Sequence, residues 1–164
     1  MHISNNGINT LKWLEGCVKQ NGQHVMYDDV SGRPVVKNTR LPHGATIGYG
    51  HLIKQGEDFS NGITEEQATE LLLQDIKNAE NAVNKVILVP LSQNQFDALV
   101  IFAYNIGTAN FAKSTVAKYI NNPNFHSNKY PNLEFAWKSW NKSRGQKIGG
   151  LINRRNHEWI LFNS

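Results

Sequence analysis

The sequence holds a single cysteine, Cys17, among its 164 residues, so an internal disulfide is excluded. This suits a protein that folds in the reducing cytosol. No apolar run approaches the ~20 residues that a membrane-spanning helix needs. Residues 1–6 have no basic stretch followed by an apolar core, so we expect no signal peptide. These absences predict a protein made in the cytoplasm and never stably inserted into a membrane.

Charged residues are sparse as well, at 18% of the chain, and their balance is a net charge of +4. A hydrophobic content of 40% is ordinary for a globular protein, which excludes a disordered chain. A chain of this length can bury the core of one domain. The mild basic charge favours polyanions of any kind, including nucleic acid, anionic lipid and bacterial wall polymers, and does not choose among them.

A short amphipathic helix is predicted at the N-terminus. Ser4 or Asn5 caps its start, and apolar residues recur at helical spacing on one face: Ile8, Leu11 and Leu14. Gly16 ends it in a left-handed cap. Glu15 therefore lies at the C-terminus of the helix, where the helix dipole disfavours an ionised carboxylate. A general acid needs that bias toward the protonated form.

Residues 17–60 contain few helix signals. Three short β-like runs, at residues 25–27, 34–36 and 45–47, are separated by the turn-forming pairs Asn-Gly, Ser-Gly and His-Gly. They predict a small irregular sheet or hairpin. No linker rich in glycine, serine or proline separates this region from the rest of the chain.

The second half of the chain predicts helices. Residues 64–67 (Thr-Glu-Glu-Gln) form a capping box that opens the longest helix, which ends near residue 88, before Pro90. Residues 92–95 form a second box. The helix that follows, from Phe96 to Tyr104, is apolar nearly all round, so we expect it to be buried at the centre of a lobe. Shorter helices are expected at residues 114–120, 132–140 and 151–162.

Together these elements predict an α+β fold in a single domain of residues 1–164. A small β-containing lobe, about residues 15–62, is joined by the interlobe helix, about residues 64–88, to a larger helical lobe. That lobe takes about residues 90–164 together with the N-terminal helix. Two lobes joined in this way form a cleft between them, and clefts bind extended polymers.

Two acidic positions flank the first of the β-like runs. Glu15 ends the first helix, and the pair Asp28–Asp29 follows Tyr27. Two carboxylic acids held apart by a strand-and-turn unit suit a reaction that needs a proton donor and a second carboxylate acting as base or nucleophile. Glycoside hydrolysis is the best-known reaction of that type.

The same stretch carries a family resemblance. It resembles the Glu, Asp and Thr signature of the phage-type lysozymes (endolysins) in three pieces: Glu15-Gly16, Tyr27-x-Asp29 and Thr46-Ile47-Gly48-x-Gly50-His51. Further matches follow in the right order: Ile63-Thr64-x-x-x-Ala68 with Gln74-Asp75, and Phe96-Asp97-Ala98-Leu99 with Asn105-x-Gly107. The last match, Gly150-Leu151-x-x-Arg154-Arg155-x-x-Glu158, is similar to the C-terminal motif of the lambdoid branch. One piece alone would be weak, but the ordered set spans nearly the whole chain.

The resemblance implies a lysozyme-like fold and a muramidase activity. Such an enzyme hydrolyses the β-1,4 bond between N-acetylmuramic acid and N-acetylglucosamine in peptidoglycan, with inversion, and thereby lyses bacteria. By the same resemblance, Glu15 is the general acid, Asp29 is the second carboxylate, and Thr46 holds the attacking water. Asp28 is the alternative to Asp29, although it also suits the cap of a turn at residues 30–32. Asn105 either binds a sugar in the cleft or caps its helix before Gly107.

Other candidate residues have a structural and a functional interpretation. We expect His51 to make structural hydrogen bonds, with Asp75 as its partner. Arg154 and Arg155 either orient Glu15 or bridge Glu158, and Trp137 and Trp140 either stack on sugars or fill the core. The histidines and acids of the first half, His24, His43, His51, Asp28 and Asp29, match no familiar zinc spacing, so we expect no metal and no other cofactor.

The chain departs from the family pattern at residues 30–45, which part Asp29 from Thr46 where compact members have only a handful of residues. This segment carries Arg33, Lys37, Arg40 and Pro42. We expect an extra hairpin tip there that lengthens the cleft or touches acidic wall polymers. The insertion leaves the placement of Asp29 to be shown by the structure.

Three competing functions have sequence features of their own. A lytic transglycosylase cuts the same bond with one acid and has no need of Asp29 or Thr46. A catalytically silent wall-binding protein needs none of the three residues. Aromatic and basic residues interleaved at 135–144 suggest single-stranded nucleic acid, but one amphipathic helix explains them more simply, so we expect no nucleic acid partner. We expect a monomer that reaches the periplasmic wall from the host cytoplasm through a holin or another delivery machine.

Overall fold

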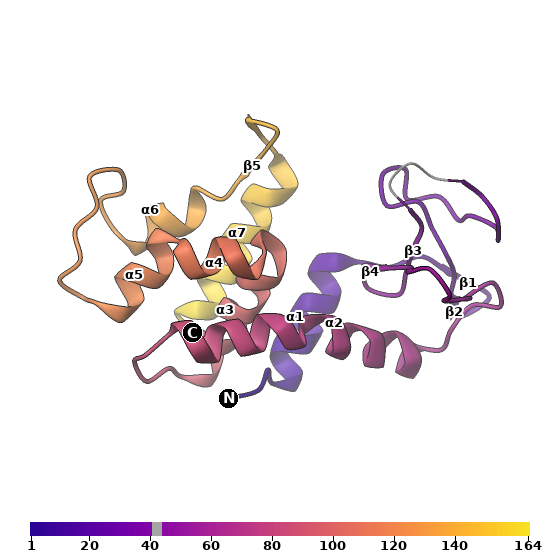
Figure 1. The fold of residues 1–164 in the computed structure, drawn as a ribbon, viewed down its shortest axis with the longest axis horizontal. Coiled ribbons are helices and arrows are strands. Elements are labelled where there is room, and N and C mark those ends of the chain that lie inside the picture. The colour runs from indigo at the N-terminus through magenta and orange to yellow at the C-terminus, as the bar shows by residue number, and fades with distance from the viewer. Residues whose placement is uncertain (41–43) are drawn as a thin grey trace. The chain divides into compact units, whose positions relative to one another are not determined.

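The computed structural model describes residues 1–40 and 44–164, so Pro42 and His43 lie outside the described residues (Figure 1). Its helices are α1 (Asn5–Glu15), α2 (Glu65–Val86), α3 (Gln93–Ile106), α4 (Thr108–Lys113), α5 (Thr115–Asn121), α6 (Leu133–Lys138) and α7 (Gly149–Phe162). Its strands are β1 (Lys19–Gln20), β2 (Gln23–His24), β3 (Thr46–Ile47), β4 (His51–Leu52), β5 (Lys142–Ser143) and β6 (Gln146–Lys147). The predicted α+β class is confirmed.

The chain divides into two compact units. The N-terminal unit is residues 10–76, and the C-terminal unit is residues 1–9 with 77–164. The division falls inside α1 and α2, so each of these helices contributes to both units. Within the described residues, every helix is either too short or too polar to span a membrane.

Helix α1 begins and ends at the predicted residues. The Ser4 hydroxyl accepts a hydrogen bond from the Gly7 N–H at 3.1 Å, which satisfies one of the free donors of the first turn. Gly16 follows the helix with a φ of +66°, a left-handed conformation that glycine adopts at no steric cost. Glu15 is therefore the last helical residue.

The N-terminal unit contains two short antiparallel hairpins. Strands β1 and β2 are joined by Asn21 and Gly22, both at positive φ, as a two-residue type I′ turn requires. Strands β3 and β4 pair Thr46 with Leu52 and Ile47 with His51. Each strand is two residues long, shorter than the predicted β-like runs. Of the residues in those runs, only 46 and 47 lie in a strand.

Tyr27 pairs on both sides in the region where the sequence predicts a small irregular sheet or hairpin. It forms one isolated bridge to Pro34 and another to Thr46, with the Tyr27 N–H donating to the Thr46 carbonyl at 2.8 Å. Pro34 has no N–H, so the pairing on its side cannot extend into a regular ladder. The expected sheet is therefore reduced to bridges around one tyrosine.

The inserted segment folds back onto the chain that precedes it. The Asp28 N–H donates to the Arg33 carbonyl at 2.9 Å, and the Val35 N–H donates to the Met26 carbonyl at 2.9 Å. Lys37 forms an ion pair with Asp58 farther along the unit. The insertion thus begins as the expected hairpin turn, and Tyr27 still pairs with Thr46.

Helix α2 opens with the predicted capping box. The Thr64 N–H donates to Gln67 Oε1 at 2.9 Å, and the Gln67 N–H donates back to Thr64 Oγ1 at 3.3 Å. The helix ends at Val86, two residues earlier than predicted. Asn121 caps this end, because its amide donates to the Val86 carbonyl and accepts from the Leu88 N–H, both at 2.7 Å.

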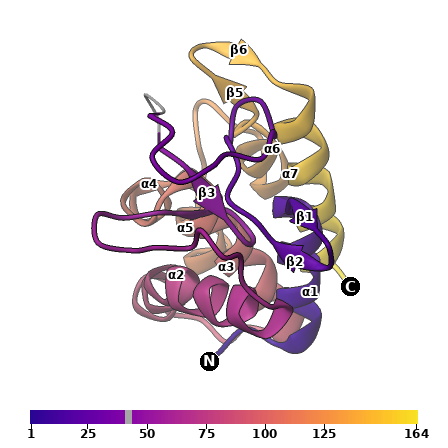
Figure 2. The ribbon, with the colours of Figure 1, turned by 90° about the vertical axis from the view of Figure 1, so that its right-hand side faces the viewer.

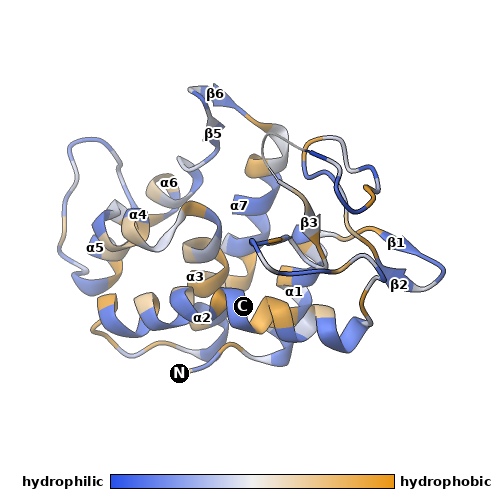
Figure 3. Cartoon of the chain, turned by 45° about the vertical axis from the view of Figure 1, so that its right-hand side comes forward, coloured by the Kyte–Doolittle hydropathy of each residue, from blue (hydrophilic) through white to orange (hydrophobic). Residues whose placement is uncertain are grey.

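Helix α3 is the buried centre of the C-terminal unit, as predicted. All residues from Phe96 to Ala103 are buried, and the helix packs mainly against α7 and α4. Figure 3 shows the hydrophobic colour around this helix. Its capping box at Ser92 and Gln95 is present. One polar side chain, Asp97, is buried with it and accepts hydrogen bonds from the Ser4 N–H and Gln93 Nε2.

Two elements of the C-terminal unit were not predicted. Helix α4 directly follows Gly107, and the β5–β6 hairpin projects next to the start of α7 (Figure 2). Both hairpin strands are two exposed polar residues long, so they lack the alternation of apolar and polar side chains that predicts a strand. The turn residues Arg144 and Gly145 have positive φ angles, as a type I′ turn needs.

Buried charge lies between α6 and α7. Glu158 is fully buried and accepts hydrogen bonds from Trp137 Nε1 at 3.0 Å, Arg155 Nη2 at 2.7 Å and Arg154 Nε at 3.3 Å. Trp137 therefore belongs to the core, and both arginines bridge Glu158. Surrounding one buried carboxylate with several donors satisfies the requirement that buried ions be paired.

Candidate active site

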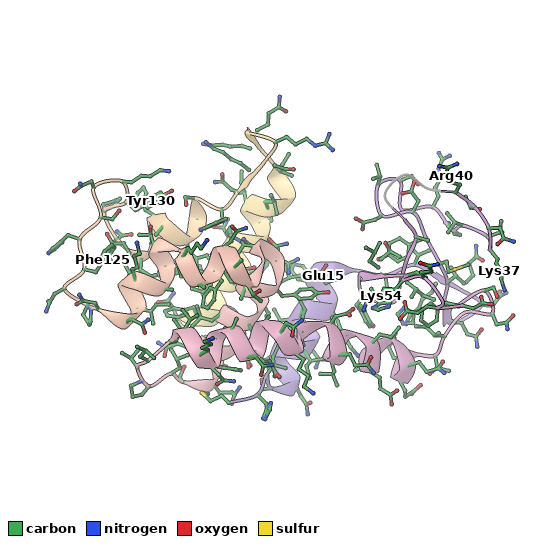
Figure 4. The ribbon with its side chains drawn as sticks, viewed as in Figure 1. Glu15, Lys37, Arg40, Lys54, Phe125 and Tyr130 are labelled. Carbon is green, nitrogen blue, oxygen red and sulfur yellow. The ribbon has the colours of Figure 1, made fainter. Side chains whose placement is uncertain are left out.

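Glu15 is the first candidate, and it lies against the backbone of Gly50. It ends α1 in the N-terminal unit and is labelled in Figure 4. A side-chain carbon placed on Gly50 would come within 3.4 Å of Glu15 Oε2, and Gly50 has a φ of +89°. The second glycine of the Gly-x-Gly-His motif therefore allows the carboxyl group to approach the β3–β4 loop closely.

Tyr27 connects the two candidate carboxylates. Burial raises the pKa of Tyr27 to about 12, helped by the negative charges of Asp29 and Glu15, while a backbone hydrogen bond with Gly50 offsets part of the rise. Asp29 lies two residues after Tyr27, in the turn that follows it. The neutral phenol of Tyr27 thus lies in the electrostatic field of both acids.

Thr46 lies directly beside Tyr27. The two residues exchange backbone hydrogen bonds in both directions, at 2.8 and 2.9 Å, and Thr46 is 3% exposed. Glu15, Asp29 and Thr46 are therefore brought around one residue although up to 31 positions separate them in the sequence. The arrangement offers a carboxyl group at a helix end, a second and exposed carboxylate, and a threonine beside them.

Asp28 is occupied in a turn. Its Oδ1 accepts from the Val30 N–H at 3.0 Å, and its Oδ2 accepts from the Ser31 hydroxyl at 2.7 Å. This is the Asx-type cap that its position before residues 30–32 suggested. Both of its carboxylate oxygens are used locally, so the geometry favours Asp29 over Asp28 as the reacting acid.

His51 is held between two carboxylates, one of them predicted. Its Nδ1 lies 2.8 Å from Asp75 Oδ2, the expected partner, and its Nε2 lies 3.0 Å from Glu57 Oε2. Burial lowers the pKa of His51, but the hydrogen bonds to Glu57 and Asp75 outweigh that effect and raise it above its usual 6.5. The ring therefore joins strand β4, helix α2 and residue 57, and its two carboxylate partners favour its protonated form.

Glu65, at the start of α2, is the most highly connected side chain of the N-terminal unit and was not predicted. It accepts hydrogen bonds from Lys12 Nζ at 3.0 Å, Lys19 Nζ at 2.9 Å, His24 Nε2 at 2.9 Å and Tyr49 Oη at 2.6 Å. Burial alone would raise the pKa of Glu65, yet these hydrogen bonds hold it well below its usual range. One carboxylate thus connects α1, the β1–β2 hairpin and the β3–β4 loop.

Asn105 lies in the C-terminal unit, at the end of α3. Arg155 Nη2 donates to Asn105 Oδ1 at 2.7 Å, and a guanidinium can only donate, so the orientation of the amide is determined. The amide NH₂ then points away from Arg155, and the side chain is exposed. Asn105 is therefore oriented to donate a hydrogen bond outward.

The described residues contain no group of three or more histidine, cysteine or acidic side chains arranged to hold a metal ion. His24 and His51 instead bond to carboxylates, through one ring nitrogen and through both respectively.

Comparison with known proteins identifies the family of the chain. Residues 19–158 match the model of the phage lysozyme family. The endolysin of Salmonella phage P22 is 36% identical over 99% of this chain and 98% of its own length. The chain belongs to the phage lysozyme family. Glu15 lies four residues before the matched range, but the P22 relative aligns with nearly the whole chain.

Other relatives differ in how much of their length is covered. The endolysin of Bacillus phage PZA is 39% identical over 100% of this chain, which spans 56% of it, just over half its length. Among solved structures, a P22 lysozyme mutant has a TM-score of 0.74 at 34% identity, covering 100% of this chain and 99% of that one. The muramidase domain of SpmX from Asticaccaulis excentricus has a TM-score of 0.73 at 32% identity, with the same coverage. The lysozyme-like fold is confirmed.

The residues that sequence reasoning missed are those that support the acids. The sequence identifies Tyr27 only as part of a motif. It places Glu65 in a capping box and does not single out Glu57. Nothing in their local sequence reveals partners, because the donors to Glu65 lie 16 to 53 residues away.

We predict that the stabilising effect of His51 declines as pH rises. The pKa of His51 is higher in the folded protein than in the unfolded chain, where it is about 6.5. The stabilisation that His51 contributes is therefore fully present below about pH 6.5 and is lost as pH rises through its folded pKa. Urea unfolding of the wild type and of His51→Gln should differ most at about pH 6 and progressively less above it. The exposed residue His126 provides the control variant, His126→Gln, with no such trend. A wild-type advantage that stays constant from pH 6 to about pH 9 would contradict the ion-pair assignment.

We also predict that Glu65→Gln destabilises the protein and that Glu66→Gln does not. Both changes remove one charge from the first turn of α2, but only Glu65 accepts from two lysines, a histidine and a tyrosine. Charge-assisted hydrogen bonds of this kind contribute roughly 1.5–3 kcal/mol each, and the partial exposure of Glu65 reduces that, so a loss of about 1–3 kcal/mol in unfolding free energy is expected. Equal losses in the two variants, measured by chemical denaturation, would show that only helix-end charge matters.

Proposed function

We propose that the protein is a muramidase, which hydrolyses the β-1,4 bond between N-acetylmuramic acid and N-acetylglucosamine in peptidoglycan. One observation carries this proposal: the phenol of Tyr27 lies in the field of Glu15 and Asp29, and its backbone pairs with Thr46. The names of two similar structures, a P22 lysozyme and a muramidase domain, agree with it. The activity, the substrate and the partners of the whole protein are proposed together.

Each of the three residues has a step in the reaction. Glu15, protonated, gives its proton to the glycosidic oxygen as the bond to the anomeric carbon breaks. A water held by the Thr46 hydroxyl attacks that carbon from the opposite face, and Asp29 orients it and takes its proton. One water is consumed, a reducing end is formed, and the configuration at the anomeric carbon inverts. Asn105 donates an amide N–H to a sugar oxygen and so helps to position the glycan.

The environment of the acids supports these roles. Glu15 ends α1 and lies against the backbone of Gly50, which places one carboxyl group at a helix end beside the β3–β4 loop. Asp29 is exposed, so a water molecule can reach its carboxylate. A lytic transglycosylase, the nearest alternative, would use the acid alone and form an anhydro product. A silent wall-binding protein would keep the fold but release nothing.

The wider biology follows from the same proposal. The protein acts as a monomer on glycan strands of the bacterial wall. It is made in the host cytoplasm and reaches the wall in the periplasm through a holin or another delivery machine. Once there, it causes lysis by cutting glycan strands.

Mass spectrometry of soluble products from purified peptidoglycan tests the function. Reducing muropeptides are expected, because hydrolysis adds water across the cleaved bond. Anhydro-muropeptides would show that the protein is a transglycosylase and not a hydrolase. If no product is released but the protein still sediments with the wall, it is a binding protein.

Three isosteric variants test the residue assignment in the same assay. Glu15→Gln should lower the rate of release by at least about 10³-fold, since an amide cannot donate the proton. Asp29→Asn should be severe, whereas Asp28→Asn should keep most of the rate because an amide oxygen still accepts from the Val30 N–H. Circular dichroism controls for folding. The reverse ranking of the two aspartates would move the second carboxylate to Asp28.

A further inference from the structure

Formal charge is divided unequally between the two units. The C-terminal unit holds 11 Lys and Arg against 4 Asp and Glu, a formal charge of +7, whereas the N-terminal unit holds 6 against 9, a charge of −3. Residues 129–147 alone contain 5 basic residues and 1 acidic residue. The basic character of the protein therefore comes from one part of the C-terminal unit and not from the candidate active site.

These basic residues surround a cavity of about 580 Å³. Four lysines line it, each from a different segment: the chain before α6, α6 itself, β5 and β6. The remaining lining residues are Tyr130, Phe135, Ser139 and Asn141. Figure 4 labels Tyr130 on the connection between α5 and α6, and Figure 2 shows the hairpin that carries two of the lysines. We call this the lysine cavity, lined by Lys129, Lys138, Lys142 and Lys147.

Two lysines of the β5–β6 hairpin lie opposite each other, so their charges repel. Lys142 and Lys147 are directly paired across β5 and β6, and like charges in that position destabilise a hairpin. Only Lys138 has an acidic partner in this stretch, Glu134 at 2.6 Å. A bound anion between Lys142 and Lys147 would turn the repulsion into attraction.

Two aromatic rings complete the lining. Phe135 is 61% exposed, so its ring is available to a molecule bound in the cavity. Lys129 lies over the ring of Tyr130, with its ammonium nitrogen 5.2 Å from the ring centre. A hydrogen bond with Ser139 and the charges of Lys129 and Lys142 lower the pKa of Tyr130, so its hydroxyl faces the same positive field. The cavity thus offers ammonium groups for anions and ring faces for carbon chains.

We propose that the lysine cavity binds a phosphate-bearing polyol or sugar polymer of the bacterial envelope, at a site separate from the candidate active site. Lysine ammonium groups bind phosphates as point charges, and arginine, the usual residue for forked binding of carboxylates, does not line the cavity. The polyol or sugar units between successive phosphates fit against Phe135 and Tyr130. A polymer with one charge per repeat can reach several lysines at once.

Nucleic acid fits the cavity less well. Binding of single strands relies on a series of exposed rings on which successive bases stack. Here only Phe135 is largely exposed, whereas Tyr130 is half-buried and Trp140, at the end of α6, is turned against Phe102. A flexible polymer without bases needs no such series.

A second attachment to the wall would assist hydrolysis without taking part in it. Two linked binding sites on one chain raise the effective concentration of each for a polymer that carries both ligands. The lysine cavity would therefore retain the protein on phosphate-rich walls between cleavage events. Its contribution should vanish on walls that lack the phosphate polymer.

Calorimetric titration with a synthetic oligomer of glycerol phosphate tests the proposal. Replacing Lys142 and Lys147 together by glutamine should weaken binding by about tenfold or more, since each lysine near a polyanion contributes roughly 1 kcal/mol. The matched control replaces Lys113 and Lys118, two exposed lysines of the same unit outside the cavity, and should change binding less than about twofold. The arginine variants Lys142→Arg and Lys147→Arg should retain binding. Melting temperatures verify that every variant folds.

The competing outcomes are distinguishable. Equal loss in the glutamine pair and the control pair would mean that only net charge attracts the oligomer, which overturns the site. Absence of binding by the wild type, or tighter binding of a single-stranded oligonucleotide with as many phosphates, would also overturn it. Release of products from phosphate-free peptidoglycan should be unchanged in the glutamine pair, so a failure of the cavity leaves the muramidase proposal untouched.

Discussion

The carboxylate of Glu65 is the contact on which the geometry of the N-terminal unit depends. It fixes Lys12, one turn before Glu15 on α1, and Tyr49, the neighbour of Gly50. Because the Glu15 carboxyl group lies against Gly50, both sides of that approach are attached to one residue at the start of α2. The candidate acid is therefore positioned by a group that has no role in the proposed reaction. A partly exposed ion pair is usually weak, but four donors on one acceptor make a network with a single geometry.

The second support is the pairing of Tyr27 with Thr46. It explains why the insertion at residues 30–45 does not move the candidate residues apart. The inserted chain turns back and pairs with Tyr27 at Pro34, and Tyr27 still pairs with Thr46 after the insertion. The same tyrosine places its neutral phenol in the field of both acids. An insertion is tolerated here because its two ends are held by backbone hydrogen bonds, and a loop costs little more free energy as it lengthens.

Most of the fold was predictable where its cause is local. The capping boxes at Thr64 and Ser92, the glycine that ends α1, and the apolar helix α3 all act within a few residues, and the structure has each of them. The β5–β6 hairpin and α4 were missed because short polar elements leave no periodic signal. The candidate acids were identified through a motif and the family resemblance, and Asp75 was expected as the partner of His51, whereas Glu57 and Glu65 act through contacts that no local pattern records. The sequence therefore predicts the candidate site residues better than it predicts the residues that hold them in place.

The division of charge gives this arrangement a consequence for binding. The unit that holds Glu15 and Asp29 is acidic overall, so it repels polyanions, and an acidic site suits the positive charge that develops on a sugar ring as its glycosidic bond breaks. The C-terminal unit carries the excess of lysine and arginine. In the proposed function, this division would let one set of residues attract an anionic wall while the acids keep their own environment. A uniformly basic surface would attract a polyanion as well, but it would also place positive charge around Glu15 and Asp29, where it would repel the cationic sugar ring of the proposed reaction.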